Sequence, residues 1–343
     1  MTTAALVHAL STEPHVFAAE LRPPRAELLG HEGMDAWIDT YHAVRRLTRE
    51  GTYVFLTDSA VGTREEDNVR HLTTNLGPDA PRSRVVPFLT SKHPIEYCLS
   101  YADRAWQQDF PVLVVLGGDR TVGAPRCLEH AWQLRAAIRA RQPGLVLGGW
   151  ANPHADPVWQ AELVAAAEFT GEFFLTQIVS HHHAARVEQF VHALERSRVQ
   201  QPGMFGVFYY RSAKPTTLAQ LREFLPVPAD ELTREFDAGA TPVEVCARTV
   251  RTLIDAGAKH FYVSNLPLGR TSETLAILRE FLPVPVDELT REFAGGATPI
   301  EICARTVRTL IDAGAKHFYI SNLPLGRTSE TLGQILTLAG VGS

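Results

Sequence analysis

Three stretches of the sequence place polar side chains where a strand ends. Glu20 precedes the prolines of Glu-Leu-Arg-Pro-Pro-Arg, which stop a strand and fix the following loop. Asp119 follows two glycines after an aliphatic run, and Gln177 ends the run Phe-Phe-Leu-Thr-Gln. A carboxyl that is desolvated at such a place has a raised pKa and can donate a proton. The pattern therefore predicts acid catalysis by Glu20, with a structural ion pair to an arginine as the alternative.

Other residues at strand ends could contact a ring-shaped ligand. Gly118 allows a ligand to approach the backbone closely, although a lone Gly-Gly-Asp is equally typical of a turn in which Asp119 caps a helix. Trp150 and His154 follow two glycines and could enclose a ring; a packed tryptophan and a surface histidine are the alternative. Gln177 is an amide at the end of an apolar strand, so it is expected to form a hydrogen bond there.

The run Ser180-His181-His182-His183 raises the question of a metal site. Successive side chains on a helix diverge by about 100°, so the three imidazoles cannot all face one ion from a helix. Ser180 is a suitable N-cap, which would place the histidines in an exposed first turn. We therefore expect no metal site here.

The elements that carry these residues alternate between short apolar runs and longer amphipathic ones. Helices are expected at residues 34–49, 95–107, 127–140, 157–169 and 184–197. Strands are expected at residues 15–21, 53–57, 84–89, 112–116, 145–150, 173–179, 204–210 and 260–264. Eight strands, each followed by a helix and several apolar on consecutive residues, predict a TIM-type (β/α)8 barrel rather than an open, doubly wound sheet. Catalytic residues in such barrels lie at the carboxyl ends of the strands.

The C-terminal part of the sequence contains a tandem repeat. Residues 221–275 recur as residues 278–332 at an offset of 57, with only six substitutions. A closed barrel has no free edge for a ninth strand, so only one copy can supply the eighth strand. Chain connectivity favours the first copy. We therefore expect a catalytic barrel over residues 1–277, with residues 278–343 as an appended copy that could compete for the eighth position.

Composition excludes several classes of protein. The 343 residues carry a formal net charge of -5 and show no basic stripe, which argues against binding of nucleic acid. No apolar stretch is long enough to span a membrane, and no signal peptide is recognisable. The four cysteines form no Cys-x-x-Cys motif, so reduced thiols in a cytoplasmic protein are expected. A homo-oligomer is compatible with the sequence.

Five of these stretches, taken in order, resemble motifs of the methylenetetrahydrofolate reductase family. Ala-Glu-Leu-Arg-Pro-Pro-Arg is similar to the opening motif of that family, and Val-Val-Leu-Gly-Gly-Asp to its Leu-Arg-Gly-Asp segment. Gly-Gly-Trp-Ala-Asn-Pro-His, Phe-Phe-Leu-Thr-Gln and Lys-His-Phe-Tyr-Val-Ser-Asn resemble three later segments. The resemblance extends over roughly residues 16–265. It implies a barrel that reduces 5,10-methylenetetrahydrofolate to 5-methyltetrahydrofolate.

The resemblance also implies roles for individual residues. Glu20 would be the general acid that protonates N5 of the folate, which opens the methylene bridge to an iminium that accepts hydride. Substrate-binding roles fall on Asp119, Gln177, Thr57 and Tyr209, the last as a replacement for a family aromatic residue that aligns with Ala213. Cofactor-binding roles fall on Gly118, Trp150, His154 and Thr90.

The sequence departs from the family at the positions that hold FAD. Gly117 stands where the family has arginine, Phe88 where it has histidine, and Ala166 where it has lysine. Loss of cations removes much of the attraction for a diphosphate. We therefore expect FAD binding to be weak or absent, with NADH or NADPH passing hydride directly to the folate.

Two alternatives remain open at this point. The chain could be a non-catalytic relative that binds folate or regulates a partner. It could also be a barrel methyltransferase, although the sequence shows no cysteine cluster for a zinc-thiolate acceptor site.

Overall fold

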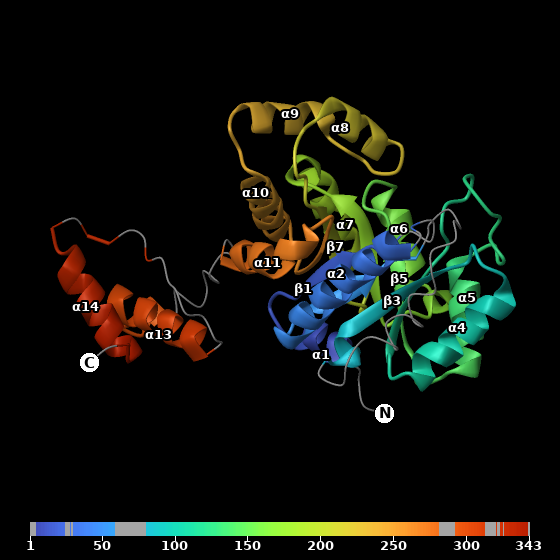
Figure 1. Cartoon of the computed structure of the whole chain (residues 1–343), viewed down its shortest axis with the longest axis horizontal. Coiled ribbons are helices and arrows are strands. Elements are labelled where there is room, and N and C mark those ends of the chain that lie inside the picture. Colours follow the sequence, from blue (N-terminus) through green and yellow to red (C-terminus); the bar gives the residue numbers. More distant parts are fainter. Residues whose placement is uncertain are drawn as a thin grey trace. The chain divides into compact units, whose positions relative to one another are not determined.

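The computed structural model describes residues 5–24, 28, 30–58, 80–280, 292–312, 320, 323–324 and 326–341. The chain divides into two compact units, Met1–Leu282 and Pro283–Ser343, which are described separately (Figure 1).

The first unit is a closed barrel of eight parallel strands, in sequence order around the ring. The strands are β1 (Phe17–Leu21), β2 (Tyr53–Leu56), β3 (Val85–Thr90), β4 (Val112–Leu116), β5 (Val146–Ala151), β6 (Phe173–Val179), β7 (Gly203–Phe208) and β8 (His260–Ser264). Strand β8 pairs with β7 and with β1, which closes the ring. The predicted TIM-type (β/α)8 fold is confirmed.

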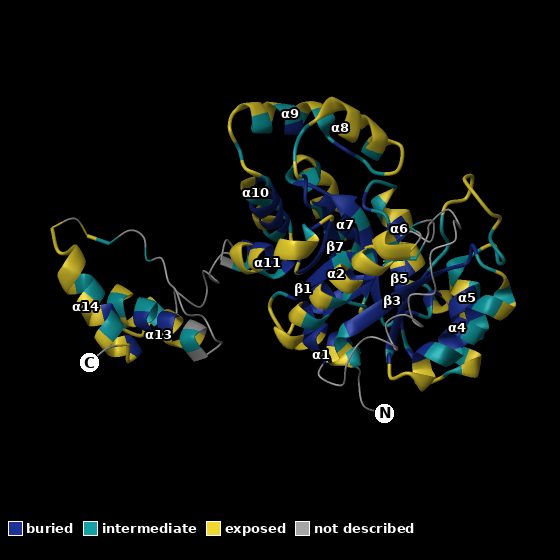
Figure 2. Cartoon of the chain, in the orientation of Figure 1, coloured by how far each residue is buried: buried dark blue, intermediate teal, exposed yellow. Residues whose placement is uncertain are grey.

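Helices follow the strands and surround the barrel (Figure 1). In this unit they are α1 (Ala5–Thr12), α2 (Gly30–Arg49), α4 (Ile95–Gln107), α5 (Ala131–Arg141), α6 (Pro157–Ala165), α7 (Ala184–Arg196), α8 (Pro215–Arg222), α9 (Ala229–Asp237), α10 (Pro242–Asp255) and α11 (Thr271–Glu280). Most of them have an exposed outer face and a buried inner face, as Figure 2 shows, so an apolar stripe covers the barrel. Helices α8 and α9 instead pack with α10 in a separate apolar cluster.

Three helices differ from the sequence-based expectation by four residues at one end, and the first of them, α2, begins at Gly30 rather than at residue 34. Helix α5 begins at Ala131 rather than at residue 127, because His130 and Gln133 form a capping box there. Helix α6 ends at Ala165 because Ala166 is extended, with φ -63° and ψ 143°, and a short 3-10 turn (Ala167–Phe169) follows. Local capping, rather than hydrophobic periodicity, sets the boundaries of α5 and α6.

Alternation along the strands separates two apolar cores. On β7, Met204 belongs to the cluster inside the barrel, whereas Phe205 and Val207 pack between barrel and helices. Helix α1 adds Leu6 and Leu10 to the inner cluster. Because α1 precedes β1, it covers the end of the barrel where the strands begin and leaves the opposite end for a site.

The eighth strand comes from the first copy of the repeat. Its counterpart in the second copy, residues 317–321, lies outside the described residues apart from Ile320. The second unit contains α13 (Pro299–Asp312) and α14 (Thr328–Ala339), packed around Ala304, Val307, Ile335 and Ala339. No helix in the described parts of either unit is long and apolar enough to cross a membrane.

The repeat supplies a matched test of which copy closes the barrel. Val263 in β8 is fully buried, and its counterpart Ile320 is partly exposed. Val263→Asp would bury an unpaired carboxylate, so we expect it to lower the free energy of unfolding by at least about 3 kcal/mol. Ile320→Asp should leave the barrel's transition unchanged. Chemical denaturation followed by near-ultraviolet circular dichroism measures both, and equal destabilisation would contradict the assignment of β8.

Candidate functional site

A cavity of about 500 Å³ opens at the carboxyl ends of the strands. Every strand, or the residue directly after it, contributes to its lining. The eight contributors, from β1 to β8, are Glu20, Thr57, Phe88, Leu116, Trp150, Gln177, Phe208 and Ser264. The cavity is therefore the mouth of the barrel, where (β/α)8 enzymes carry their active sites.

Glu20 lies where the dry barrel core meets this cavity. Its carboxylate Oε1 accepts a hydrogen bond from the Ser264 hydroxyl on the neighbouring strand. Although the residue keeps some exposure through the cavity, the surrounding protein desolvates the carboxyl. Desolvation raises its pKa from 4.5 to about 7, and the Ser264 hydrogen bond opposes this only in part. A carboxyl with this pKa can hold and release a proton near neutral pH.

Gln177 reaches the cavity because β6 is irregular at this point. The register with β7 shifts between Leu175 and Ile178, as in a β-bulge. The Thr176 hydroxyl accepts from the Gly206 amide at 3.1 Å and donates to the Gln177 carbonyl at 2.9 Å. The Gln177 side-chain oxygen accepts from the Ile178 amide at 2.9 Å. The bulge thus fixes the side chain, and Nε2 is the part of its amide that a ligand can meet.

Thr57 lines the cavity, as does Asp58 next to it. Asp58 binds the residues after β3: its Oδ2 accepts from the Thr90 amide at 2.6 Å and from the Thr90 hydroxyl at 2.9 Å. His93 Nε2 lies 2.9 Å from the same oxygen. Thr90, expected at a cofactor, is buried and donates its hydroxyl to Asp58 instead. The Thr90 hydroxyl therefore links the end of β3 to Asp58, which follows β2.

Asp119 does not line the cavity. Gly118 turns the chain with φ +71°, and Asp119 is exposed on the loop that follows. Its Oδ1 accepts from the amides of Thr121 at 2.7 Å and Val122 at 2.8 Å, and these bonds lower its pKa. The expected role of Asp119 in substrate binding is thus not supported by its position, and the alternative of a turn-capping aspartate describes it better.

Tyr209 does not line the cavity either, because Phe208 takes that position. Phe208 ends β7 on the inside of the barrel, and by strand alternation the next residue faces outward. Tyr209 is packed in the outer core, and its amide donates to the Ser264 carbonyl at 2.9 Å. The aromatic surface at this edge of the cavity is therefore Phe208.

Of the two remaining residues expected at a cofactor, Trp150 lines the cavity and His154 does not. Trp150 lines the cavity and is 37% exposed, so its indole is available to stack on a ligand. His154 is half-buried outside the cavity, with Nε2 2.8 Å from the Ile178 carbonyl oxygen and its ring edge-on to His183. Burial lowers the pKa of His154, so a neutral imidazole that supports the end of β6 describes its role.

The three positions associated with FAD carry no cation of their own. Phe88 is buried against Phe55 with ring centroids 5.8 Å apart, and Ala166 directly follows the end of α6. A Cβ on Gly117 would lie 2.8 Å from the guanidinium carbon of Arg126. That guanidinium donates to the carbonyls of Gly118 and Glu129. None of the three positions therefore supplies a cation from its own side chain to a diphosphate, and the guanidinium beside Gly117 comes from Arg126.

Several lining residues were not identified from the sequence. Ser264 contacts Glu20 only because β8 closes on β1, which no local pattern reveals. Arg22 and Arg211 are exposed residues of the lining, and Arg211 donates to the backbone of Asn265 and Leu266. Asn265 adopts a positive φ of 62° directly after β8. The one sequence feature that could have indicated these residues is the Ser264-Asn265 pair, two polar residues at the end of an apolar strand.

Outside the mouth, His181, His182 and Glu235 form a group of three potential metal ligands within the described residues. No side chain of this group lines the mouth cavity. We expected the three histidine side chains to point in different directions. His183 does so, since its Nδ1 lies 3.1 Å from the Ser180 hydroxyl oxygen, whereas His181 and His182 point to the same carboxylate. They lie in a 3-10 turn (η3, His181–His183) rather than in a regular α-helix.

Comparisons with solved structures found similar proteins, of which the first has the same fold. An uncharacterized protein from Clostridium thermocellum that binds two copies of 5-methyl-5,6,7,8-tetrahydrofolic acid matches at a TM-score of 0.58 and 14% identity, over 80% of this chain and 97% of that one. Dihydrodipicolinate synthase from Oceanobacillus iheyensis matches at 0.45 and 12% identity, over 98% and 99%. A variant of Rhizobium etli pyruvate carboxylase with acetyl coenzyme A matches at 0.44 and 13%, over 74% and 21%. No protein-family model and no curated protein sequence matches the chain.

The raised pKa of Glu20 makes stability depend on pH. Between pH 4.5 and about 7 the folded state holds a proton that the unfolded state releases, so the free energy of unfolding falls as pH rises through this window. Glu20→Gln keeps an acceptor for Ser264 and removes this titration. We expect the variant to be more stable than the parent by up to about 3 kcal/mol at about pH 8, with no pH-dependent advantage below pH 4.5.

Denaturant unfolding at several pH values measures the difference. Asp119→Asn is the matched control, because the lowered pKa of Asp119 keeps that carboxylate ionised through the whole window. A Glu20→Gln advantage that does not change with pH would show that Glu20 is ionised in the folded protein throughout.

Proposed function

We propose that the mouth of this barrel binds a reduced folate, and that the protein reduces 5,10-methylenetetrahydrofolate to 5-methyltetrahydrofolate with NADH or NADPH as second substrate. The observation that carries the proposal is Glu20, a carboxyl with a pKa of about 7 at the floor of the cavity. A protein with the same fold binds 5-methyltetrahydrofolic acid, which supports reduced folates as the ligand class.

Glu20 supplies the proton that the reaction needs. The product keeps its one-carbon unit on N5, so the bond that breaks joins the bridging carbon to N10. Atom balance therefore places the incoming proton on N10 rather than on N5. The electron pair of the broken bond goes to N10, and the carbon stays on N5 as an iminium. Hydride from the reduced nicotinamide then completes the methyl group, and the nicotinamide leaves oxidised.

The surroundings of Glu20 suit both of its protonation states. Desolvation favours the neutral acid before transfer, and the Ser264 hydroxyl stabilises the carboxylate afterwards. The cavity walls at Phe88, Trp150 and Phe208 are apolar surfaces on which a flat bicyclic ring can lie. A water-poor position strengthens the interaction of the acid with the nitrogen it protonates.

Polar residues are placed to orient the folate. The Gln177 amide at the bulge can hydrogen-bond the heteroatoms of the pterin edge. Arg22 and Arg211 are exposed residues of the lining, where cations can meet the carboxylates of the folate tail. Because Gly117, Phe88 and Ala166 supply no cation to a flavin diphosphate, we assign hydride transfer directly from the nicotinamide and derive no step through FAD.

Folate binding without reduction is the second candidate. It is favoured by one observation: Asp119, the other carboxylate that the resemblance assigns to the site, lies on an exposed turn outside the cavity. In that case the protein binds 5-methyltetrahydrofolate by calorimetry but oxidises no NADH or NADPH.

Reductase activity is tested by spectroscopy and turnover on the full chain. We expect the purified protein to show no flavin absorption and to oxidise NADH or NADPH only when methylenetetrahydrofolate is present. Glu20→Gln should lower kcat by about 100- to 10,000-fold, the usual contribution of a general acid. The control is Glu188→Gln, which removes an exposed carboxylate on α7. A yellow protein contradicts direct hydride transfer, and normal turnover by Glu20→Gln contradicts the role of Glu20.

The pH dependence of the rate gives an independent check. The proton donor is the protonated form of Glu20, which is lost as pH rises through about 7. We expect kcat/KM to be level at lower pH and to fall about tenfold per unit above this value. A profile that rises with pH would show that a deprotonated group, and not this carboxyl, limits the reaction.

A further inference from the structure

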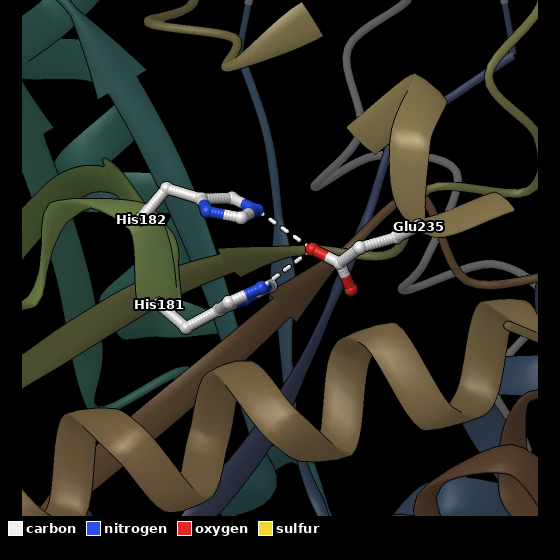
Figure 3. Close-up of side chains that lie close together, drawn as sticks. All are labelled: His181, His182 and Glu235. Carbon is white, nitrogen blue, oxygen red and sulfur yellow. Dashed lines mark hydrogen bonds and ion pairs between the residues drawn. The ribbon is translucent and has the colours of Figure 1, made fainter. Parts of the chain in front are cut away.

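Two histidines and a glutamate meet at a second place on the barrel. His181 and His182 lie in η3, directly after β6, and Glu235 lies in α9. Figure 3 shows both imidazoles extending from one turn toward the same carboxylate. Glu235 Oε1 lies 2.6 Å from His181 Nε2 and 2.7 Å from His182 Nε2. The three ligand atoms are thus already collected at one point, although the residues come from separate segments of the chain.

Hydrogen bonding around His181 indicates which of its nitrogens carries a proton. His181 Nδ1 lies 2.8 Å from the Thr249 hydroxyl oxygen. That hydroxyl already donates to the Val245 carbonyl one turn earlier, at 3.0 Å. It therefore accepts from His181 Nδ1–H, which leaves the lone pair on Nε2 toward Glu235 in the neutral imidazole. A lone pair and a carboxylate oxygen repel one another at this distance, so the contact requires either a second proton on His181 or a metal cation between the two atoms.

The repeat shows that the threonine geometry does not depend on the histidine. In the second copy, Thr306 corresponds to Thr249 and donates to the Ile302 carbonyl at 3.0 Å. Glu292 and Arg305 correspond to Glu235 and Arg248, and they also form an ion pair, at 2.9 Å. The glutamate, arginine and threonine are therefore ordinary features of the repeat. What the barrel adds is the pair of histidines, which precede the repeated segment in the sequence.

The neighbours of the three ligands complete a coordination site. Arg248 pairs with Glu235 Oε2, which holds the carboxylate with Oε1 toward the histidines. Four ligands at zinc's usual bond lengths lie about 3.3 Å apart, so a bound ion requires Glu235 to retreat by less than about 1 Å. A cavity of about 630 Å³, lined by His182, Glu235 and Arg248 among others, leaves room for water as a further ligand. It shares no lining residue with the barrel mouth.

We propose that His181, His182 and Glu235 bind one divalent transition-metal ion of the zinc class. Two imidazoles and one carboxylate suit Zn²⁺ or Co²⁺, whereas Mg²⁺ prefers oxygen ligands alone. Three protein ligands leave at least one coordination position open to the cavity. Thr249 is a positioning residue, because its hydroxyl fixes the tautomer of His181. The site is independent of folate binding at the barrel mouth.

The repeat provides the controls for a titration of the metal-free full chain with Zn²⁺ in the presence of excess Mg²⁺. We expect one equivalent to bind to the parent protein. Glu235→Gln and His182→Ala should each weaken binding at least about 100-fold, whereas Glu292→Gln, the same change in the second copy, should have no effect. Thr249→Val should weaken binding by about 10- to 100-fold, and Thr306→Val should not. Circular dichroism verifies that each variant is folded, and His182→Ala removes only a partly exposed side chain.

Substitution with Co²⁺ identifies the ligands. A visible absorption spectrum of a four- or five-coordinate ion without a thiolate charge-transfer band supports the site, since it excludes the cysteines. The proposal is overturned if no equivalent of Zn²⁺ binds, if Glu235→Gln and Glu292→Gln bind alike, or if the cobalt spectrum shows thiolate ligation.

Discussion

The pairing of β8 with β1 is the contact on which the barrel, its inner core and its mouth all depend. The register sets Phe17 against Phe261 and Ala19 against Val263, so Ser264 comes beside Glu20 one residue further along. A slip of one residue would turn every side chain of β8 to the opposite face. Tyr262 would then leave the inner core, and the hydroxyl beside Glu20 would be lost. Closure and the chemistry of Glu20 are therefore one constraint.

The inner core explains why a carboxyl near the mouth is both costly and useful. Below Glu20 the barrel is filled by apolar and aromatic side chains such as Phe55 and Tyr262, which surround the carboxyl on that side with apolar surface. The Tyr262 hydroxyl donates its hydrogen bond to the Thr176 carbonyl at the bulge, so it does not donate to Glu20. One side of Glu20 is thus apolar, and the other faces the cavity. This asymmetry raises the pKa while leaving the proton accessible to a ligand.

Features that lie within a single strand, such as its apolar run, could be predicted from the sequence. Contacts between side chains of different strands could not. Eight apolar runs with intervening helices were sufficient to predict the barrel and the position of Glu20 at its mouth. Tyr209 does not line the cavity, because β7 ends at Phe208, two residues earlier than expected, and alternation along the strand directs Phe208 inward. Asp119 was misplaced because the positive φ of Gly118 diverts the loop. The contacts of Glu20 with Ser264 and of His181 with Glu235 join distant segments, so no local spacing encodes them.

The tandem repeat shows how far context, rather than local sequence, determines function. Helices α10 and α13 have nearly the same sequence and the same length of 14 residues, each behind a Thr-Pro start. Yet Cys246 in α10 is buried and has its pKa raised to about 12, whereas the equivalent Cys303 is partly exposed. Likewise Glu235 meets two histidines, and Glu292 meets only the arginine of its own repeat among the described residues. Copying the segment reproduced its helix and its internal ion pair, because short-range contacts form both. It could not reproduce a site whose other half lies in η3, directly after β6 of the barrel, since that half was not copied.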